Sequence, residues 1–369
     1  EGAERRSAVP IPFLDLLALR HPVFQAPMAG GGDTPELVAA VAEAGALGFV
    51  GAAYLGPEQI AETAASVRAR TRRPFGINLF ARLPAPAPVD GRAALERVAP
   101  YYRELGLPPP AEVPRPEDRF AEQLRAALEA DPAVISFTFG IPSPDVVAAI
   151  HSRGMAFLAT ATTVEEARAV EAAGADAVIA QGSEAGGHRG TFASDFESGL
   201  VGTMALVPQV ADAVRVPVVA SGGIMDGRGI AAALALGASA VQLGTAFLTC
   251  HESGITEAYR AAILGSGEHQ TRITRAFSGR PARGIVNRFM TEVEARPDVI
   301  LPFPVQHALT RPLRVAAGKA GRSEFLNLWA GQGLRMARRQ TAAELIERLS
   351  QQTRATVDRL ANVNRPEQR

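Results

Sequence analysis

The strongest constraint on the fold is a repeated alternation of short apolar runs with helical patterns rich in Ala, Glu and Arg. The apolar runs cover residues 23–26, 48–50, 75–80, 134–138, 156–159, 177–181, 216–221 and 240–244. Helical patterns follow most of them, at residues 34–44, 57–70, 117–130, 163–173, 203–214 and 227–236. About eight strand-helix repeats predict an α/β protein with a parallel (β/α)8 TIM barrel. A doubly wound open sheet is the alternative, because periodicity does not show whether a sheet closes.

Two stretches lie outside this alternation. Residues 84–116 are rich in proline, and residues 266–321 are rich in arginine and proline. We expect them to form a smaller cap or substrate subdomain. The barrel domain is then built from residues 10–83, 117–265 and 322–350. Residues 341–360 carry an amphipathic pattern, so we expect residues 351–369 to contain a C-terminal helix and a frayed tail.

Charge and hydropathy exclude several classes of partner. The chain has 369 residues, with 38 Lys and Arg against 38 Asp and Glu. This balance argues against binding to nucleic acid or to an anionic membrane surface. No apolar run is long and uncharged enough to span a bilayer, and residues 1–10 lack the apolar region of a secretory signal. We therefore expect a cytoplasmic enzyme that acts on a small molecule, and a homodimer is one possible oligomeric state.

The small numbers of cysteine, lysine and histidine exclude or disfavour several kinds of catalysis and metal binding. Cys250 is the only cysteine, which excludes an internal disulfide and a cysteine-based metal site. Lys319 is the only lysine, and it lies in a Gly- and Ala-rich segment, so Schiff-base catalysis is disfavoured. The six histidines show none of the close pairing that zinc and iron sites use, and we expect no metal.

A glycine-rich segment carries the clearest candidate for catalysis. Residues 180–192 follow an apolar run and read Ala-Gln-Gly-Ser-Glu-Ala-Gly-Gly-His-Arg-Gly-Thr-Phe. Glycine permits sharp turns and a close approach of the backbone to a ligand. Since barrel enzymes place catalytic groups just beyond the strand ends, His188 is the predicted catalytic residue. Glu184, in the same tight loop, is expected to cap main-chain N–H groups.

The strand ends also predict a cofactor site, because they share one mouth in a barrel. They supply Ala26, Pro27, Met28, Asn78, Gln181, Gly186, Gly187, Ser221, Gly222, Gly223, Gln242, Leu243, Gly244 and Thr245. The glycine turns after the last two strands can bind a phosphate through N–H groups at helix N-termini, without lysine. The neutral amides suit the edge of a flavin ring. FMN fits this combination best; the alternative is that the glycines only turn the chain.

These segments resemble the FMN-dependent nitronate monooxygenases, formerly called 2-nitropropane dioxygenases. The resemblance rests on residues 181–190, on Ala-Pro-Met at 26–28 and on Ile-Asn-Leu-Phe at 77–80. Residues 274–283 and the Leu-Trp-Ala-Gly-Gln-Gly run at 328–333 extend it over nearly the whole chain. FMN-dependent enoyl-ACP reductases share the Glu-Ala-Gly-Gly-His element. The resemblance implies that Gln332 approaches the flavin from the far segment and that His188 stands over it.

The resemblance implies oxidation of alkyl nitronates, such as propionate 3-nitronate, by O2 to a carbonyl compound and nitrite. If neutral nitroalkanes are also used, a base must remove the α-proton, and the unperturbed pKa of histidine suits His188 to that task. An NAD(P)H-dependent FMN reductase acting on an enoyl thioester or a quinone is the nearest alternative. Two further alternatives remain. One is a phosphosugar isomerase or synthase, which uses no redox chemistry, and the other is a flavin-binding sensor that catalyses no reaction.

Overall fold

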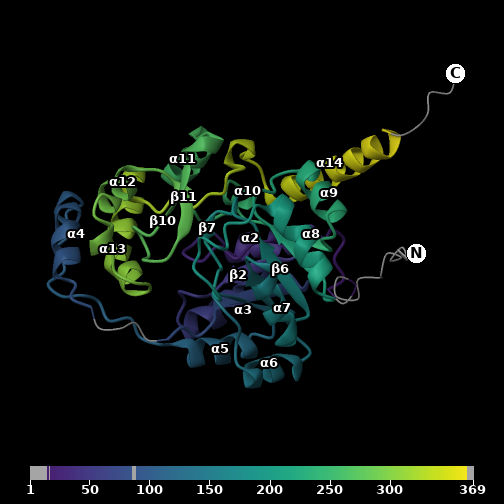
Figure 1. Ribbon diagram of the computed structural model, residues 1–369, viewed down its shortest axis with the longest axis horizontal. Helices are drawn as coiled ribbons and strands as arrows, with labels where there is room; N and C mark the ends of the chain where they lie inside the picture. Colours follow the sequence, from purple (N-terminus) through teal and green to yellow (C-terminus); the bar gives the residue numbers. More distant parts are fainter. Residues whose placement is uncertain (1–14, 16, 85–88, 364–369) are drawn as a thin grey trace.

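The computed structural model describes residues 15, 17–84 and 89–363. Our expectations for residues 1–10, for residues 85–88 of the proline-rich stretch and for the tail beyond residue 363 lie outside the described residues. Figure 1 shows the chain as a barrel with a second group of elements at one side.

Eight parallel strands form the barrel, as the sequence pattern predicts. They are β1 (Val23–Gln25), β2 (Gly48–Gly51), β3 (Phe75–Phe80), β4 (Val134–Thr138), β5 (Ala156–Ala161), β6 (Ala177–Gln181), β8 (Val218–Ser221) and β9 (Ala240–Leu243). Their order is β1-β9-β8-β6-β5-β4-β3-β2. A parallel bridge from Phe24 to Leu47 joins the two edges, with Gln25 N donating to Leu47 O at 2.8 Å. This contact rules out the open-sheet alternative.

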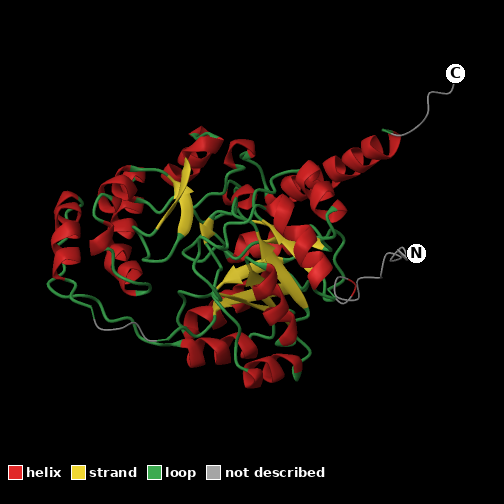
Figure 2. Cartoon of the chain, in the orientation of Figure 1, coloured by secondary structure: helices red, strands yellow, loops and turns green. Residues whose placement is uncertain are grey.

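Helices surround the barrel and connect its strands (Figure 2). They are α2 (Pro35–Glu43), α3 (Pro57–Arg70), α5 (Phe120–Glu129), α6 (Pro144–His151), α7 (Val164–Ala172), α8 (Thr203–Ala213), α9 (Gly227–Ala235) and α10 (Thr245–Leu248). Thr34 caps α2 by accepting from Leu37 N, and Asp226 caps α9 by accepting from Arg228 N and Gly229 N. Such caps satisfy N–H groups that have no partner within the helix.

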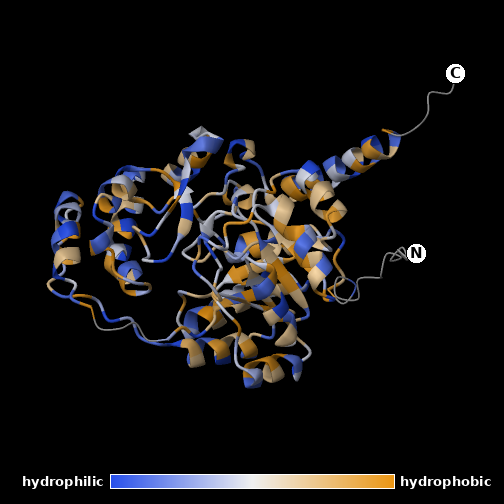
Figure 3. Cartoon of the chain, viewed as in Figure 1, coloured by the Kyte–Doolittle hydropathy of each residue, from blue (hydrophilic) through white to orange (hydrophobic). Residues whose placement is uncertain are grey.

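Side chains that alternate along the strands divide the apolar core into two layers. Positions on one face of each strand fill the barrel interior, among them Phe24, Phe49, Val134, Leu158, Ile179, Val219 and Ala240. Positions on the other face pack against the helices, as Val178 and Val241 do. Figure 3 shows the hydrophobic colour concentrated on the strands and on the helix faces toward them. The interior is thus a packed core up to the level of the strand ends.

A second body lies beside the barrel mouth and has its own apolar core. It contains α4 (Arg92–Glu104), α11 (Glu257–Gly265), α12 (Arg288–Glu294), α13 (Val305–Ala320) and a sheet ordered β10 (Thr271–Thr274), β11 (Ala282–Ile285) and β7 (Gly187–His188). The sequence pattern gave no indication of α4, which lies within the proline-rich stretch. His188 is not in a free loop: it pairs with Ala282 in the antiparallel ladder.

The C-terminal helix α14 (Ala342–Asn362) packs on α9 and α2 of the barrel through its first half (Figure 1). It runs without a break across the boundary that we expected near residue 350, and the domain boundaries themselves stay a prediction. Within the described residues, no helix combines the length and the apolar character needed to cross a membrane.

Gly76 tests the packing of the barrel interior. A Cβ at this position would lie 2.3 Å from the ring of Phe49, so Gly76→Ala must displace a fully buried ring. We expect the substitution to lower the free energy of unfolding by about 1–3 kcal/mol, measured by urea denaturation. Gly265→Ala is the control, because a Cβ there meets no atom within 4 Å. Equal stabilities of Gly76→Ala and the parent protein would contradict this account of the core.

Candidate active site

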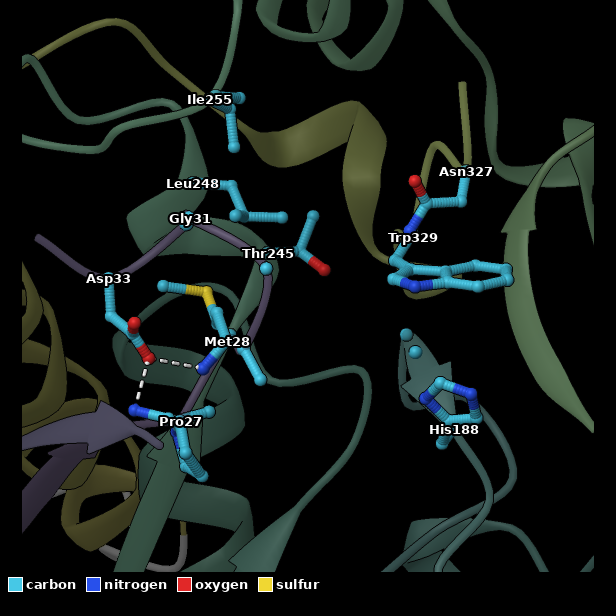
Figure 4. Close-up of a pocket in the computed structure, with 18 of the residues that line it drawn as sticks. Pro27, Met28, Gly31, Asp33, His188, Thr245, Leu248, Ile255, Asn327 and Trp329 are labelled. Atoms are coloured by element: carbon cyan, nitrogen blue, oxygen red, sulfur yellow. Dashed lines mark hydrogen bonds between the residues drawn. The ribbon is translucent and has the colours of Figure 1, made fainter. Parts of the chain in front are cut away.

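The carboxyl ends of the strands open into one cavity of about 810 Å3, which the second body covers from the side. Figure 4 shows Met28 and Thr245 on one side of this cavity and His188 and Trp329 on the other. The cavity therefore has one wall from the barrel loops and one from segments that pack against the second body. A site of this position and size is typical of enzymes built on a barrel.

The alternation of side chains along the strands explains why polar groups point into the mouth. On three strands an interior position and a cavity position lie at i and i+2: Ile179 and Gln181, Val219 and Ser221, and Ala240 and Gln242. Because side chains repeat every second residue, each pair faces the barrel axis. Asn78 lines the same cavity, and its Nδ2 donates to Ser136 Oγ at 2.9 Å.

Asp33 fixes the loop after β1. Its Oδ2 accepts hydrogen bonds from Met28 N at 2.6 Å and from Gly51 N at 2.8 Å, which the dashed lines in Figure 4 mark. The carboxylate thus joins the loop that carries Ala26, Pro27 and Met28 to the end of β2. Burial raises the pKa of Asp33 from 3.8 to about 7, against the effect of the N–H donors.

The turns after β8 and β9 are both formed by glycines at the edge of the cavity. Gly222 and Gly223 have φ angles of +118° and +71°, a region that disfavours other residues. Gly244 precedes the short helix α10, whose first residue, Thr245, accepts at Oγ1 from Gly331 N at 3.0 Å. Oε1 of Gln242 is buried and has no hydrogen-bond partner among the described residues. A buried acceptor without a donor indicates a group that a ligand completes.

His188 is held by both main-chain and side-chain contacts. Gln181 Nε2 donates to the carbonyl of His188 at 3.0 Å, and Gln181 Oε1 accepts from Gly190 N at 2.8 Å. The Nε2 atom of His188 lies 2.8 Å from Ser278 Oγ. Arg189 is almost fully buried and donates to the carbonyls of Gly182, Gln181 and Gly199, so it fixes the main chain rather than facing the cavity.

The surroundings of His188 change its acidity. The rings of Phe139 and Trp329 both lie 5.6 Å from the imidazole, centroid to centroid. Burial, followed by the charges of Arg280 and Arg314, lowers the pKa of His188 from 6.5 to about 3. The expectation of an unperturbed pKa is therefore wrong, because the imidazole lies among aromatic rings and near two cations. It stays uncharged at neutral pH.

All but two of the site residues predicted from the sequence line this cavity. The cavity is lined by Ala26, Pro27, Met28, Asn78, Gln181, Gly186, Gly187, His188, Ser221, Gly222, Gly223, Gln242, Gly244 and Thr245. Leu243 instead has a buried side chain, and Gln332 an exposed one, although Gln332 N donates to Glu184 O at 2.9 Å. Contact of any of these residues with FMN stays a prediction. The capping role of Glu184 is confirmed, since it accepts from Thr203 N and Oγ1 at the start of α8.

The sequence-based prediction assigned no role in the site to several other residues that line the cavity. Among them are Asp33, Tyr54, Tyr259, Ser278, His307, Arg311, Arg314, Asn327 and Trp329. Tyr54 could have been found, because it follows the end of β2 as closely as the selected residues follow other strands. Arg314 carried no such signal: it lies inside α13, outside the strand-helix alternation.

The family model and the curated relatives agree on one family. A family model described as nitronate monooxygenase matches residues 12–352. A nitronate monooxygenase of Pseudomonas aeruginosa is 45% identical over 347 residues, covering 93% of this chain and 99% of that protein. The structure of nitroalkane oxidase from Streptomyces ansochromogenes aligns with a TM-score of 0.86 and 43% identity, covering 94% and 99% of the two chains. FabK from Thermotoga maritima aligns with a TM-score of 0.75 and 30% identity, covering 96% and 99%.

Asp33 gives a test of the loop geometry. Asp33→Ala leaves two N–H groups without an acceptor, and we expect it to lower the free energy of unfolding by about 1–3 kcal/mol. Asp33→Asn is expected to lose less, because its carbonyl oxygen can still accept from Met28 N and Gly51 N.

Titration of Asp33 makes the stability of the parent protein depend on pH, and Asp33→Asn removes this dependence. Because the pKa of Asp33 is raised from 3.8 to about 7, the folded protein binds more protons than the unfolded chain in this interval. Stability from this group therefore falls as the pH rises from 4 to 7. Urea denaturation at pH 5 and pH 8 should show a larger loss for the parent protein than for Asp33→Asn. Parallel losses would contradict the raised pKa.

Proposed function

The chain belongs to the nitronate monooxygenase family and is an enzyme, and on that premise we propose that it uses bound FMN and O2 to oxidise alkyl nitronates. The products are a carbonyl compound and nitrite. Two nitronates and one O2 give two carbonyl compounds and two nitrites, so that each nitronate carbon gains one oxygen atom as its bond to nitrogen breaks. Propionate 3-nitronate is the substrate that we propose to test first. A cytoplasmic location remains a proposal from the sequence.

The observation that carries the FMN proposal is the unpartnered Oε1 of Gln242 on the cavity wall. A ring N–H of a flavin would supply the donor that this acceptor lacks. Gly30, Gly31 and Gly187 also have positive φ angles, and a Cβ at any of them would meet no atom within 4 Å. These glycines leave open volume along the wall, which fits a bulky planar ligand.

The residues assigned to each part of FMN follow from their chemistry. Asn78 and Gln242 would bind the polar edge of the ring, and Met28 would pack on it. The turns at Gly222–Gly223 and Gly244–Thr245 would bind the phosphate through N–H groups, which needs no lysine. When bound, FMN supplies the oxidation of the nitronate and the transfer of its electrons to O2, which no side chain can perform.

His188 has a role that does not need a charge. The neutral imidazole, fixed by the β7 ladder and by Ser278, can orient the nitronate through a hydrogen bond. Its lowered pKa makes it a weak base for the α-proton of a neutral nitroalkane. We therefore expect preformed nitronates to react faster than the parent nitroalkanes.

A visible spectrum tests the cofactor and the substrate together. We expect the purified protein, after reconstitution with FMN, to show an oxidised-flavin band that bleaches when propionate 3-nitronate is added without O2. Bleaching by NAD(P)H but not by the nitronate would support the FMN reductase alternative. If no flavin band appears after reconstitution, the cofactor proposal is wrong.

His188→Asn separates orientation from proton abstraction. We expect turnover of ethyl nitronate and of nitroethane to fall by similar factors, about 10-fold or more, because the neutral imidazole orients the bound substrate and is a weak base. A loss about 100-fold larger for nitroethane than for ethyl nitronate would instead identify His188 as the base. Because the pKa of His188 is about 3, kcat/KM for the nitronate should show no inflection near pH 6.5.

A further inference from the structure

Among the described residues, Ser278 alone forms a hydrogen bond with the imidazole of His188. Its Oγ lies 2.8 Å from Nε2 of the ring. The other ring nitrogen, Nδ1, bonds to none of the described residues but is not sealed from solvent. Because His188 lines the cavity, Nδ1 is the nitrogen that a bound substrate can reach.

Aromatic packing holds the imidazole of His188 in this orientation. Four rings of the described residues have centroids 5.6 to 6.4 Å from it, those of Phe139, Trp329, Phe303 and Phe80. A half-turn of the imidazole about its Cβ–Cγ bond would place the carbon Cε1 where Nε2 now meets the hydroxyl of Ser278. That hydrogen bond would then be lost. The packed rings and Ser278 therefore keep Nδ1 toward the cavity.

The turn that carries Ser278 also fixes one of these rings. Phe139 has a φ angle of +73°, in the left-handed region that bulky residues rarely adopt. The guanidinium of Arg280 stacks on its ring, with Cζ 3.8 Å from the ring centroid. Arg280 follows Ser278 by two residues, through Gly279 with a φ angle of +83°. One short turn thus supplies both the hydrogen bond to His188 and the cation that holds the ring beside it.

The hydroxyl of Ser278 has two possible acceptors for its one proton. Its Oγ lies 3.1 Å from the carbonyl oxygen of Arg280, and it accepts from Arg280 N at 3.2 Å. If the hydroxyl donates to Arg280 O, its two lone pairs accept from Arg280 N and from Nε2–H of His188. Every hydrogen-bonding position of the hydroxyl is then used, and Nδ1 is unprotonated. If the hydroxyl instead donates to Nε2, the hydrogen of the imidazole must be on Nδ1.

The two arrangements present opposite groups to the cavity. In the first, Nδ1 of His188 is an acceptor; in the second, Nδ1–H is a donor that suits an oxygen atom of an anion. Protonation of both nitrogens is disfavoured, because burial, followed by the charges of Arg280 and Arg314, lowers the pKa of His188 to about 3. The tautomer of a neutral ring therefore decides which group meets the substrate.

We propose that Ser278 is a positioning residue that selects the tautomer of His188. In the protein without substrate, the hydroxyl donates to Arg280 O, and Nδ1 is unprotonated. When a nitronate binds, the hydroxyl turns to Nε2, and Nδ1–H donates to a nitronate oxygen. The ring releases the proton of Nε2 to water and takes one from water at Nδ1, so its charge does not change. This inference rests on the proposed function only for the identity of the anion.

Nitrogen NMR of protein labelled with 15N in its histidine rings reads the tautomer directly. The spectrum of His188→Asn identifies the signals of His188 among those of the six histidines. With FMN bound and no substrate, we expect Nε2 of the parent protein to carry the hydrogen and Nδ1 to carry none. A protonated Nδ1 in this state, or a charged ring at pH 7, would overturn the inference.

Ser278→Ala removes the donor that the second tautomer needs. We expect KM for ethyl nitronate to rise by about 5- to 10-fold, the effect of one hydrogen bond, while kcat changes by less than about 2-fold. Ser278→Thr keeps a hydroxyl at this position and should recover part of the loss. This division between KM and kcat follows because the tautomer acts on substrate binding.

Ser253→Ala is the matched control. The hydroxyl of Ser253 is also buried and donates to a main-chain carbonyl, Gly32 O at 3.0 Å, but it does not bond to His188. We expect this variant to lose stability, because a buried carbonyl loses its donor, and to keep the KM of the parent protein. Thermal unfolding measures the stability of each variant.

The outcomes separate a failure of this inference from a failure of the proposed function. Equal changes of KM in Ser278→Ala and Ser253→Ala would assign Ser278 a structural role, as would a fall in kcat without a rise in KM. A Ser278→Thr variant that folds but recovers nothing would also contradict the inference. If the parent protein oxidises no nitronate, the proposed function has failed, and the NMR signals of His188 still decide on the tautomer.

Discussion

The antiparallel pairing of β7 with β11 is the interaction on which the arrangement of the site depends. Through it, the segment that leaves β6 becomes a strand of the second sheet, with His188 opposite Ala282. The buried side chain of Arg189 holds the same segment by donating hydrogen bonds to the carbonyls of Gly182, Gln181 and Gly199. The catalytic candidate is therefore fixed by main-chain pairing with β11 and by the side chains of Gln181 and Arg189, which bond to main-chain groups around the end of β6. Arg311 and Arg314 of α13 line the same cavity from the second body.

Much of the fold could be predicted because the strand-helix repeat is a local property of the sequence. The eight repeats predicted the barrel, but they did not reveal the contact that closes it, which joins Phe24 to Leu47 across the two sheet edges. The helix α4 was missed because the surrounding prolines obscure its pattern. Likewise, β7 is only two residues long and exists through its partner strand, so no periodicity reveals it.

The strand-end residues of the site could be predicted for a related reason. Parallel strands end at one mouth, and alternation then decides which residues face it, as for Gln181 and Gln242. Arg314 could not be predicted, because the face that a helix turns toward a cavity depends on tertiary packing. The low pKa of His188 was equally inaccessible: it arises from rings and charges, such as Trp329 and Arg280, that are remote in the sequence.

The two walls of the cavity belong to bodies with separate apolar cores, the barrel on one side and the cluster around α4, α12 and α13 on the other. Substitutions on the inner face of α13 can therefore change which molecules enter without disturbing the strands that carry the amides and the glycine turns. A division of this kind allows substrate range to diverge between relatives while the oxidation chemistry is inherited intact. It also marks α13 as the segment to exchange when a new substrate range is sought on the same barrel.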